Sequence, residues 1–328
     1  MLFSLVGCKR MITIYRNEVY YDLNVDIAEE LGYYDWHRAR PKGEEMVACS
    51  PFRDESSPSF SINLETGLWI DFGSNHDLYG RGGLVTLLSF LRNETPLEVE
   101  DYLLEKYGID LSDTDKLELN VNFDTSTKVD TIISTEDYQP YAYRSPYLAG
   151  RGISEKVQRA FKVGYDRKSK AVALAWHDVK GNMVNIKFRS INSKIFYYYP
   201  TGQQLRNHIY GMHFIYKLKP DTVFLVESEI DCLYLWSIGV PAIALGGSKI
   251  SEKRKQLLLR CPAKRIVLAT DNDKVGNEIR DKVTKLLVGY KELYEIKIPE
   301  NYNDVNDVPP EILKRVCDNA TPVNLILF

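Results

Sequence analysis

The sequence predicts a mixed α/β protein, α+β overall, whose C-terminal part is an open parallel sheet. The strands expected after residue 220, such as "VFLVE" and "RIVLA", are continuous apolar runs, as in parallel strands buried on both faces. Segments of helical length separate these runs, so strand and helix alternate along the chain. The stretch before them instead alternates apolar and polar residues, which is typical of antiparallel strands.

The 328 residues are expected to form two domains joined by a linker. Residues 1–110 are predicted to form a small α+β domain, with short strands followed by helices in "GLVTLLSFLRN" and "PLEVEDYLLEKYG". Residues 111–138 are polar, acidic and weakly periodic, which indicates an interdomain linker. Residues 139–328 are expected to form the second domain. Its parts are 139–218, 219–308 and a C-terminal tail, 309–328.

The segment from Arg151 to Lys219 is strongly basic, although the whole chain has a net charge of −3. It contains fourteen Lys and Arg residues and three acidic ones. The alternating runs "AVALAWHD" and "MVNIKFRS" predict an antiparallel hairpin that turns at Lys180–Asn182. Part of the basic segment is therefore expected to be a sheet surface. Such a local excess favours a polyanionic partner over an ordinary solvated surface.

Acidic residues follow three of the strands expected after residue 220. They are Glu227, Glu229 and Asp231 after the first, Asp271 and Asp273 after a later one, and Asp304 and Asp307 after the last. Because the carboxyl ends of parallel strands meet at one edge of a sheet, where ligands bind, we expect these side chains to lie close together.

Carboxylates this close would raise one another's pKa unless a cation lay between them. Oxygen ligands without His or Cys suit Mg²⁺ or Mn²⁺, and phosphoryl transfer is a natural use of such a site. Local roles are the alternative: Asp273 as a helix cap, Glu229 and Asp231 as complements to a helix dipole, and residues 301–307 as a turn. Because all three would have to coincide at one sheet edge, the sequence favours a metal site.

Three stretches resemble the Toprim domain, a Rossmann-like parallel-sheet domain of DnaG-type and phage primases, of type IA and II topoisomerases and of some nucleases. They are "LVESEIDCLYLWSIGVPAIALGGSK", "IVLATDNDKVGNEI" and "NDVND". The resemblance implies that Glu227, Asp271 and Asp273 are catalytic, and that these three bind metal together with Asp231 and Asp304. Ser228 departs from the glycine that many members carry at this position.

The segment before this domain resembles the catalytic core of DnaG-type primases. "YLAGRGISEKVQRAFKVGYD" is similar to the element that opens that core, and the stretch ending at Tyr210-Gly211 is similar to its basic subdomain. The resemblance implies that five basic side chains bind nucleic-acid or nucleotide phosphates: Arg151, Lys187, Arg189, Lys194 and Arg206. Arg206 lies one residue out of register in this likeness.

Residues 50–74 resemble the N-terminal zinc ribbon of the same primases, in the frame Pro51-Phe52, Pro58-Ser59-Phe60 and Phe72-Gly73. The four ligand positions hold residues that cannot form a closed zinc site: Ser50, Arg53, Asp71 and Ser74. No zinc is therefore expected, and other contacts must supply the folding free energy. Two replacements are open. One is an ion pair between Arg53 and Asp71, and the other is apolar packing by Phe52, Phe60, Trp69 and Phe72.

These resemblances imply a DNA primase of phage or plasmid type, which makes short RNA primers on single-stranded DNA from NTPs by Mg-dependent nucleotidyl transfer. The sequence contains no Gly-x4-Gly-Lys-Ser/Thr loop, so we expect no helicase domain and a separate replicative helicase as partner. Two alternatives stay open: a Toprim-type metal-dependent nuclease, and a non-catalytic DNA-binding replication adaptor.

The five cysteines are scattered and form no Cys-x-x-Cys pair, which predicts free thiols in a reducing compartment. No apolar run approaches the roughly 18 residues of a membrane span, so no membrane partner is expected. The predicted location is the cytoplasm, that of a bacterial host if a phage or plasmid encodes the chain.

Overall fold

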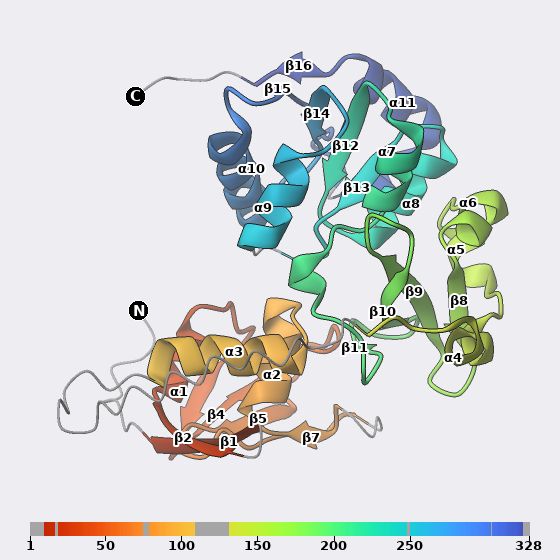
Figure 1. The fold of residues 1–328 in the computed structure, drawn as a ribbon. Helices are drawn as coiled ribbons and strands as arrows, with labels where there is room; N and C mark the ends of the chain where they lie inside the picture. Colours follow the sequence, from red (N-terminus) through yellow and green to blue (C-terminus); the bar gives the residue numbers. More distant parts are fainter. Residues whose placement is uncertain are drawn as a thin grey trace. The chain divides into compact units, whose positions relative to one another are not determined.

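The computed structural model describes residues 10–16, 19–74, 79–108, 131–247, 250–302 and 304–323. The chain divides into two compact units. The first contains the described residues up to 108 together with Ser193–Ile195, and the second contains the other described residues from 131 onward. Each unit has its own arrangement of sheets and helices (Figure 1).

The described residues of the first unit form two antiparallel sheets and three α-helices. A hairpin of β1 (Arg10–Arg16) and β2 (Val19–Val25) forms one sheet. The other sheet has five strands in sequential order: β3 (Arg40–Lys42), β4 (Glu45–Ala48), β5 (Phe60–Asn63), β6 (Trp69–Asp71) and β7 (Arg81–Gly82). The helices are α1 (Ile27–Gly32), α2 (Leu84–Arg92) and α3 (Pro96–Tyr107). The expected strands and helices are therefore present, and the β1–β2 hairpin is an addition that we did not expect.

Local sequence signals set the helix boundaries in this unit. Thr95 and Glu98 form a capping box at the start of α3, where each side chain bonds the backbone of the other residue. Asn93 ends α2 in the left-handed conformation, at φ +52°. The two helices then pack against the large sheet through side chains such as Leu87, Leu88 and Leu103, all of which are fully buried.

The second unit begins inside the stretch expected to be a linker. Residues 109–130 lie outside the described residues, but Ile133 is buried and its backbone N–H donates to the carbonyl of Met183. The helix α4 (Thr135–Tyr138) follows, capped by Ser134. The described part of the second unit thus starts at residue 131, before the expected boundary at residue 139.

The basic segment forms a four-stranded antiparallel sheet. Its order is β11 (Phe196–Tyr198), β10 (Met183–Ser190), β9 (Ala171–His177) and β8 (Val163–Asp166). The expected hairpin is confirmed, since β9 and β10 pair antiparallel and Gly181 takes a positive φ of +91° at the turn. Short helices precede this sheet: η2 (Gln139–Tyr141), α5 (Pro146–Gly150) and α6 (Glu155–Ala160).

The expectation that this segment is partly an exposed sheet surface was wrong for its two central strands. Every residue of β9 is buried, and so is every residue of β10 except Arg189. Val172 and Trp176 belong to one core cluster, whereas Ala173 and Phe188 belong to another on the opposite face. The alternating pattern therefore marks two covered faces, because the small alanines of β9 pack as core and not as surface.

The C-terminal part is the predicted parallel sheet. The strand order is β13 (Ala242–Ala244), β12 (Thr222–Val226), β14 (Arg265–Leu268), β15 (Glu292–Glu295) and β16 (Thr321–Pro322). The first four strands are parallel, and β16 adds an antiparallel edge that we did not expect. The chain leaves β12 toward β13 on one side and later crosses to β14 on the other, so the direction of winding reverses between β12 and β14.

Helices cover both faces of this sheet. The face with Val223, Leu225 and Ile266 packs against α7 (Met212–Leu218), α9 (Glu252–Leu259) and α10 (Lys274–Leu287). The opposite face, with Phe224 and Val267, packs against α8 (Glu229–Ser237) and α11 (Pro310–Asp318). In Figure 1, α9 and α10 lie side by side and apart from α11. No helix within the described ranges is long and apolar enough to cross a membrane.

Candidate active site

The carboxyl ends of β12 and β14 bring two of the predicted acids together. Glu227 follows β12 and Asp271 comes shortly after β14, at the point where the winding of the sheet reverses. Crevices at such a point are where open α/β sheets bind ligands. The backbone N–H of Asp271 donates to Glu227 Oε1 at 3.0 Å. The predicted convergence of these strand ends is therefore present in the structure.

The acids at this edge influence one another electrostatically. Burial, followed by the charges of Glu227, Asp231, Asp304 and Asp273, raises the pKa of Asp271 to about 8. Burial and then the charge of Asp304 raise the pKa of Asp231 to about 7. The pKa values of Glu227 and Asp304 are also raised, chiefly by burial. The five predicted metal ligands thus form one electrostatic cluster, which we call the acidic cluster.

Several members of the acidic cluster also have the local roles that were the alternative interpretation. Asp273 caps α10 by accepting the N–H of Gly276 at 2.7 Å. Asp304 caps the short helix η4 (Val305–Asp307) by accepting the N–H of Asp307 at 2.9 Å. Asp231 accepts a hydrogen bond from the Ser228 hydroxyl at 2.5 Å. These contacts orient the carboxylates, and they coexist with the cluster.

The acidic cluster fits a hard dication in its chemistry. Its donors are all carboxylates, and Asp271 Oδ1 is buried without a hydrogen-bond partner among the described residues. Within the part of the chain that the structure describes, no three His, Cys, Asp or Glu side chains are already arranged to hold a metal ion. A cation at this edge would therefore draw the carboxylates together, and it would offset the burial and the mutual repulsion that raise the pKa values of Glu227, Asp231, Asp271 and Asp304.

Arg151 lies beside the acidic cluster and is held there by Asn306. Arg151 Nε donates to Asn306 Oδ1 at 2.6 Å, and Asn306 Nδ2 donates back to the Arg151 carbonyl at 2.9 Å. The backbone N–H of Asn306 donates to Asp231 Oδ1 at 3.1 Å. Asn306 therefore links a predicted phosphate-binding cation to a predicted metal ligand. The sequence showed Asn306 near the acids, but not this connecting role.

The other four predicted cations occupy different environments. Arg189 is half-buried, its side chain forms no hydrogen bond or ion pair with another described residue, and its charge acts to lower the pKa of Asp231. Lys187 is buried and paired with Glu229 at 3.1 Å. Arg206 lies in the short helix η3 (Leu205–Asn207). Lys194 belongs to the segment grouped with the first unit, where its Nζ lies 2.7 Å from Asp54 Oδ1.

Glu229 is the functional candidate that the sequence reasoning did not include among the site residues. It opens α8, is 3% exposed, and accepts hydrogen bonds from Lys187 and from Trp176 Nε1, at 3.3 and 3.2 Å. Burial lowers the pKa of Lys187 against the opposing effect of Glu229. The acid was visible in the sequence, but nothing in the spacing indicated that its partner would come from β10.

In the first unit, an ion pair joins two of the four former ligand positions of the ribbon-like stretch, Arg53 and Asp71. Arg53 Nη1 lies 2.5 Å from Asp71 Oδ2, and Arg53 Nη2 lies 2.8 Å from Asp71 Oδ1. The Ser50 hydroxyl donates to Asp71 at 2.6 Å, and Glu55 also pairs with Arg53 at 2.7 Å. Burial would raise the pKa of Asp71, but hydrogen bonds from Arg53 and Ser50 outweigh it and lower the pKa. The predicted Arg53–Asp71 pair is confirmed.

Apolar packing accompanies this ion pair. Phe52, Phe60 and Trp69 are at most 3% exposed and their rings contact one another. Phe72, the fourth predicted member, is 74% exposed, so its expected packing role was wrong. The reason is the alternation that runs along β6 and into the residue after it: Trp69 and Asp71 face inward, whereas Ile70 and Phe72 face outward.

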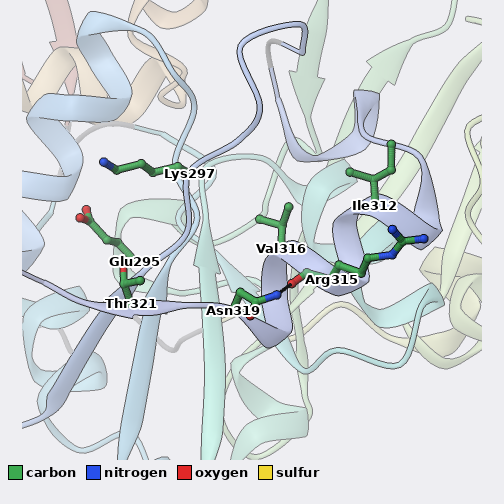
Figure 2. A pocket seen from close by; sticks show the side chains of 7 residues that line it. All are labelled: Glu295, Lys297, Ile312, Arg315, Val316, Asn319 and Thr321. Carbon is green, nitrogen blue, oxygen red and sulfur yellow. Dashed lines mark hydrogen bonds between the residues drawn. The ribbon is translucent and has the colours of Figure 1, made fainter.

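The second unit also contains a hollow of about 410 Å³ along β15, β16 and α11 (Figure 2). Its lining residues are Glu295, Lys297, Ile312, Arg315, Val316, Asn319 and Thr321. In Figure 2 the side chains of Lys297 and Arg315 extend in different directions and do not converge on a common point. The hollow contains no member of the acidic cluster and none of the predicted cations.

The parallel sheet and the acidic cluster coincide with a match to a known family model. Residues 224–309 match the family described as Toprim-like. The match includes most of β12, all of β13 to β15 and all five members of the acidic cluster.

Proteins named DNA primase are similar to most of the chain. The DNA primase of Clostridium acetobutylicum is 23% identical over 92% of this chain and 58% of its own length. That of Escherichia coli is 21% identical over 89% and 60%. This chain therefore spans less than two thirds of the length of these relatives. A crystal structure of the Aquifex aeolicus primase, comprising zinc-binding and RNA polymerase domains, covers 91% of this chain at 20% identity with a TM-score of 0.48. Residues 224–309 thus match the Toprim-like family model, and the chain is similar over 92% of its length to a bacterial DNA primase.

Proposed function

We propose that this protein is a DNA primase that joins NTPs into short RNA primers on a single-stranded DNA template. The observation that carries the proposal is the similarity to DNA primases over 92% of the chain, because it includes both the acidic cluster and the basic strands before it. A nuclease or a topoisomerase could use the same acidic cluster. The cations Arg151 and Arg189 beside that cluster favour a reaction in which phosphates are bound from the basic segment as well.

We assign the catalytic role to Glu227, Asp271 and Asp273, which together with Asp231 and Asp304 would hold Mg²⁺ or Mn²⁺. A bound dication would neutralise triphosphate charge and lower the barrier to attack by the 3′-hydroxyl. The protein's own contribution is to place the carboxylates: Ser228 orients Asp231, and the backbone of Asp271 orients Glu227. Arg151 is then held by Asn306 where it can take a phosphate of the template or the nucleotide.

We further propose a separate replicative helicase as partner and the cytoplasm as location. The described cysteines Cys49, Cys232, Cys261 and Cys317 are buried free thiols, which is in keeping with a reducing compartment. Lys194 and Arg206 stay in the proposal as contacts to nucleic acid. Lys187 does not, because its charge is buried against Glu229.

The test is primer synthesis by the full chain on single-stranded DNA with four labelled ribonucleotides and Mg²⁺ or Mn²⁺. We expect short products from the wild type and from Asp281→Asn, a matched control at an exposed position of α10. Asp271→Asn should lose them by about 10³-fold, because a dication contributes several kcal/mol of charge stabilisation. Cleavage of the DNA without nucleotides would instead support a nuclease. Wild-type activity in a replication assay with Asp271→Asn would support the adaptor.

A further inference from the structure

Lys187 and Glu229 form a buried ion pair between β10 of the antiparallel sheet and the start of α8, which packs on the parallel sheet of the second unit. Their side chains are 6% and 3% exposed, and Lys187 Nζ lies 3.1 Å from Glu229 Oε1. Trp176 on β9 donates its Nε1–H to the same oxygen at 3.2 Å. A Cβ at Gly246, which has a φ of +67°, would lie 2.6 Å from the Trp176 ring and 3.2 Å from Glu229 Oε1. The pair is therefore tightly enclosed.

Stability alone does not explain such a pair. Desolvation of two charges offsets most of their mutual attraction, and apolar side chains of similar volume often hold two elements together equally well. A charge pair does differ from apolar packing in one respect: it requires a defined separation and direction between its two groups. The pair is suited to setting the position of β10 relative to α8.

The residues next to the pair belong to the candidate active site. Arg189 lies two positions after Lys187 on β10, so both side chains point to the same face of the strand. Asp231 lies two positions after Glu229, in the first turn of α8. The Arg189 side chain makes no hydrogen bond or ion pair with another described residue, and its charge acts on Asp231. Among the described residues this side chain therefore has no partner, and it shares the strand face from which Lys187 reaches the first turn of α8.

We propose that the Lys187–Glu229 pair is a positioning device, which holds Arg189 against the acidic cluster so that its guanidinium binds the triphosphate of the incoming nucleotide. The inference rests on the proposed primase function and deepens it. The guanidinium presents planar paired donors that match phosphate oxygens, and its usefulness depends on how well it is placed. Lys187 and Glu229 would not touch the nucleotide themselves.

The experiment separates positioning from stability by replacing both charges together. Lys187→Met with Glu229→Leu removes the pair without leaving a lone buried charge, and Lys187→Glu with Glu229→Lys exchanges the charges as a second test. Arg189→Gln, the triple variant of Arg189→Gln with the apolar replacement, and the control Lys180→Met at the exposed hairpin turn complete the set. Each is measured by thermal unfolding, by kcat and KM for the nucleotide in primer synthesis, and by binding of fluorescent ATP with Mg²⁺.

We expect the apolar double variant to keep its melting temperature but to bind nucleotide about tenfold or more weakly, with KM raised more than kcat is lowered. Arg189→Gln should show the same loss, and the triple variant should bind no more weakly than Arg189→Gln alone, because the pair acts through Arg189. The charge exchange should restore part of the affinity.

Two results would overturn the inference. One is wild-type nucleotide affinity in the folded apolar double variant. The other is a triple variant in which the separate losses multiply. If the wild type makes no primers, the proposed function fails, and the binding measurements still decide whether Lys187 and Glu229 position Arg189.

Discussion

Loss of the Asp71 charge is expected to weaken the ribbon-like stretch of the first unit. Asp71→Asn preserves shape but replaces one carboxylate oxygen with an NH₂ group that faces the donors of Arg53 and Ser50. Removing one partner of a buried pair costs roughly 3–5 kcal/mol. Because the Arg53 side chain is 25% exposed and keeps Glu55 as a partner, we reduce this to about 2–3 kcal/mol.

Hydrogen exchange of the full chain, followed by mass spectrometry, measures this loss where it occurs. Amides of β4, β5 and β6 should exchange about 30- to 150-fold faster in Asp71→Asn, if they exchange through opening of the first unit. The control Asp54→Asn removes a carboxylate that is 88% exposed and pairs only with Lys194 among the described side chains, so it should change exchange little.

The double variant Arg53→Met, Asp71→Leu tests the physical reason for this loss. It leaves no unpaired buried charge, so its exchange should lie closer to the wild type than that of Asp71→Asn. Unchanged protection in Asp71→Asn would refute the reasoning, and would show that packing by Phe52, Phe60 and Trp69 is sufficient without the ion pair.

Three further predictions concern the acidic cluster and its surroundings. Gly276→Ala would place a Cβ 2.2 Å from the Asp271 carbonyl and 2.7 Å from Glu227 Oε1, so we expect primer synthesis to fall about tenfold or more in single-turnover kinetics. Gly32→Ala serves as the glycine control, because a Cβ at Gly32 would have no atom within 4 Å and its φ is not positive. Asp271 has a folded pKa of about 8, above the value of about 4 for an unfolded Asp, so its contribution to stability is lost as pH rises toward 8. In EDTA, the melting temperature of the wild type should therefore fall from pH 7 to 9, and that of Asp271→Asn should fall less. Mg²⁺ should raise the wild-type melting temperature more at pH 8 than at pH 7. A wild-type melting temperature that stays level over this range would contradict that assignment. Affinity for single-stranded DNA should decrease as the salt concentration rises. If Arg151 contacts a template phosphate, Arg151→Gln should reduce the slope of log K against log salt by about 0.7. An unchanged slope would mean that Arg151 binds the nucleotide or has a structural role.

The sequence by itself determined the parallel sheet and the acids at its edge. The run "VFLV" is apolar at every position because both faces of β12 are covered, and this signal is local. The acids follow directly from it: once β12 and β14 are parallel neighbours, Glu227 and Asp271 must come to the same edge. Likewise, Ser228 caps α8 and Asp273 caps α10 by accepting a backbone N–H three positions further along the chain, so both caps depend only on nearby residues.

Only the tertiary structure decided which side chains are partners across the fold. Lys187 was expected to be a phosphate contact, and its burial against Glu229 depends on the packing of β10 beside α8, 42 residues away. Arg151 and Asn306 are separated by 155 residues, and no periodicity relates them. Phe72 was expected in the core, but the packing of β6 decided which alternating set faces inward, Trp69 with Asp71 and not Ile70 with Phe72. The periodicity of a sequence depends on the backbone conformation of that segment and on which of its faces are buried. The partner of a charged side chain is instead set by the packing of segments that are distant in the sequence.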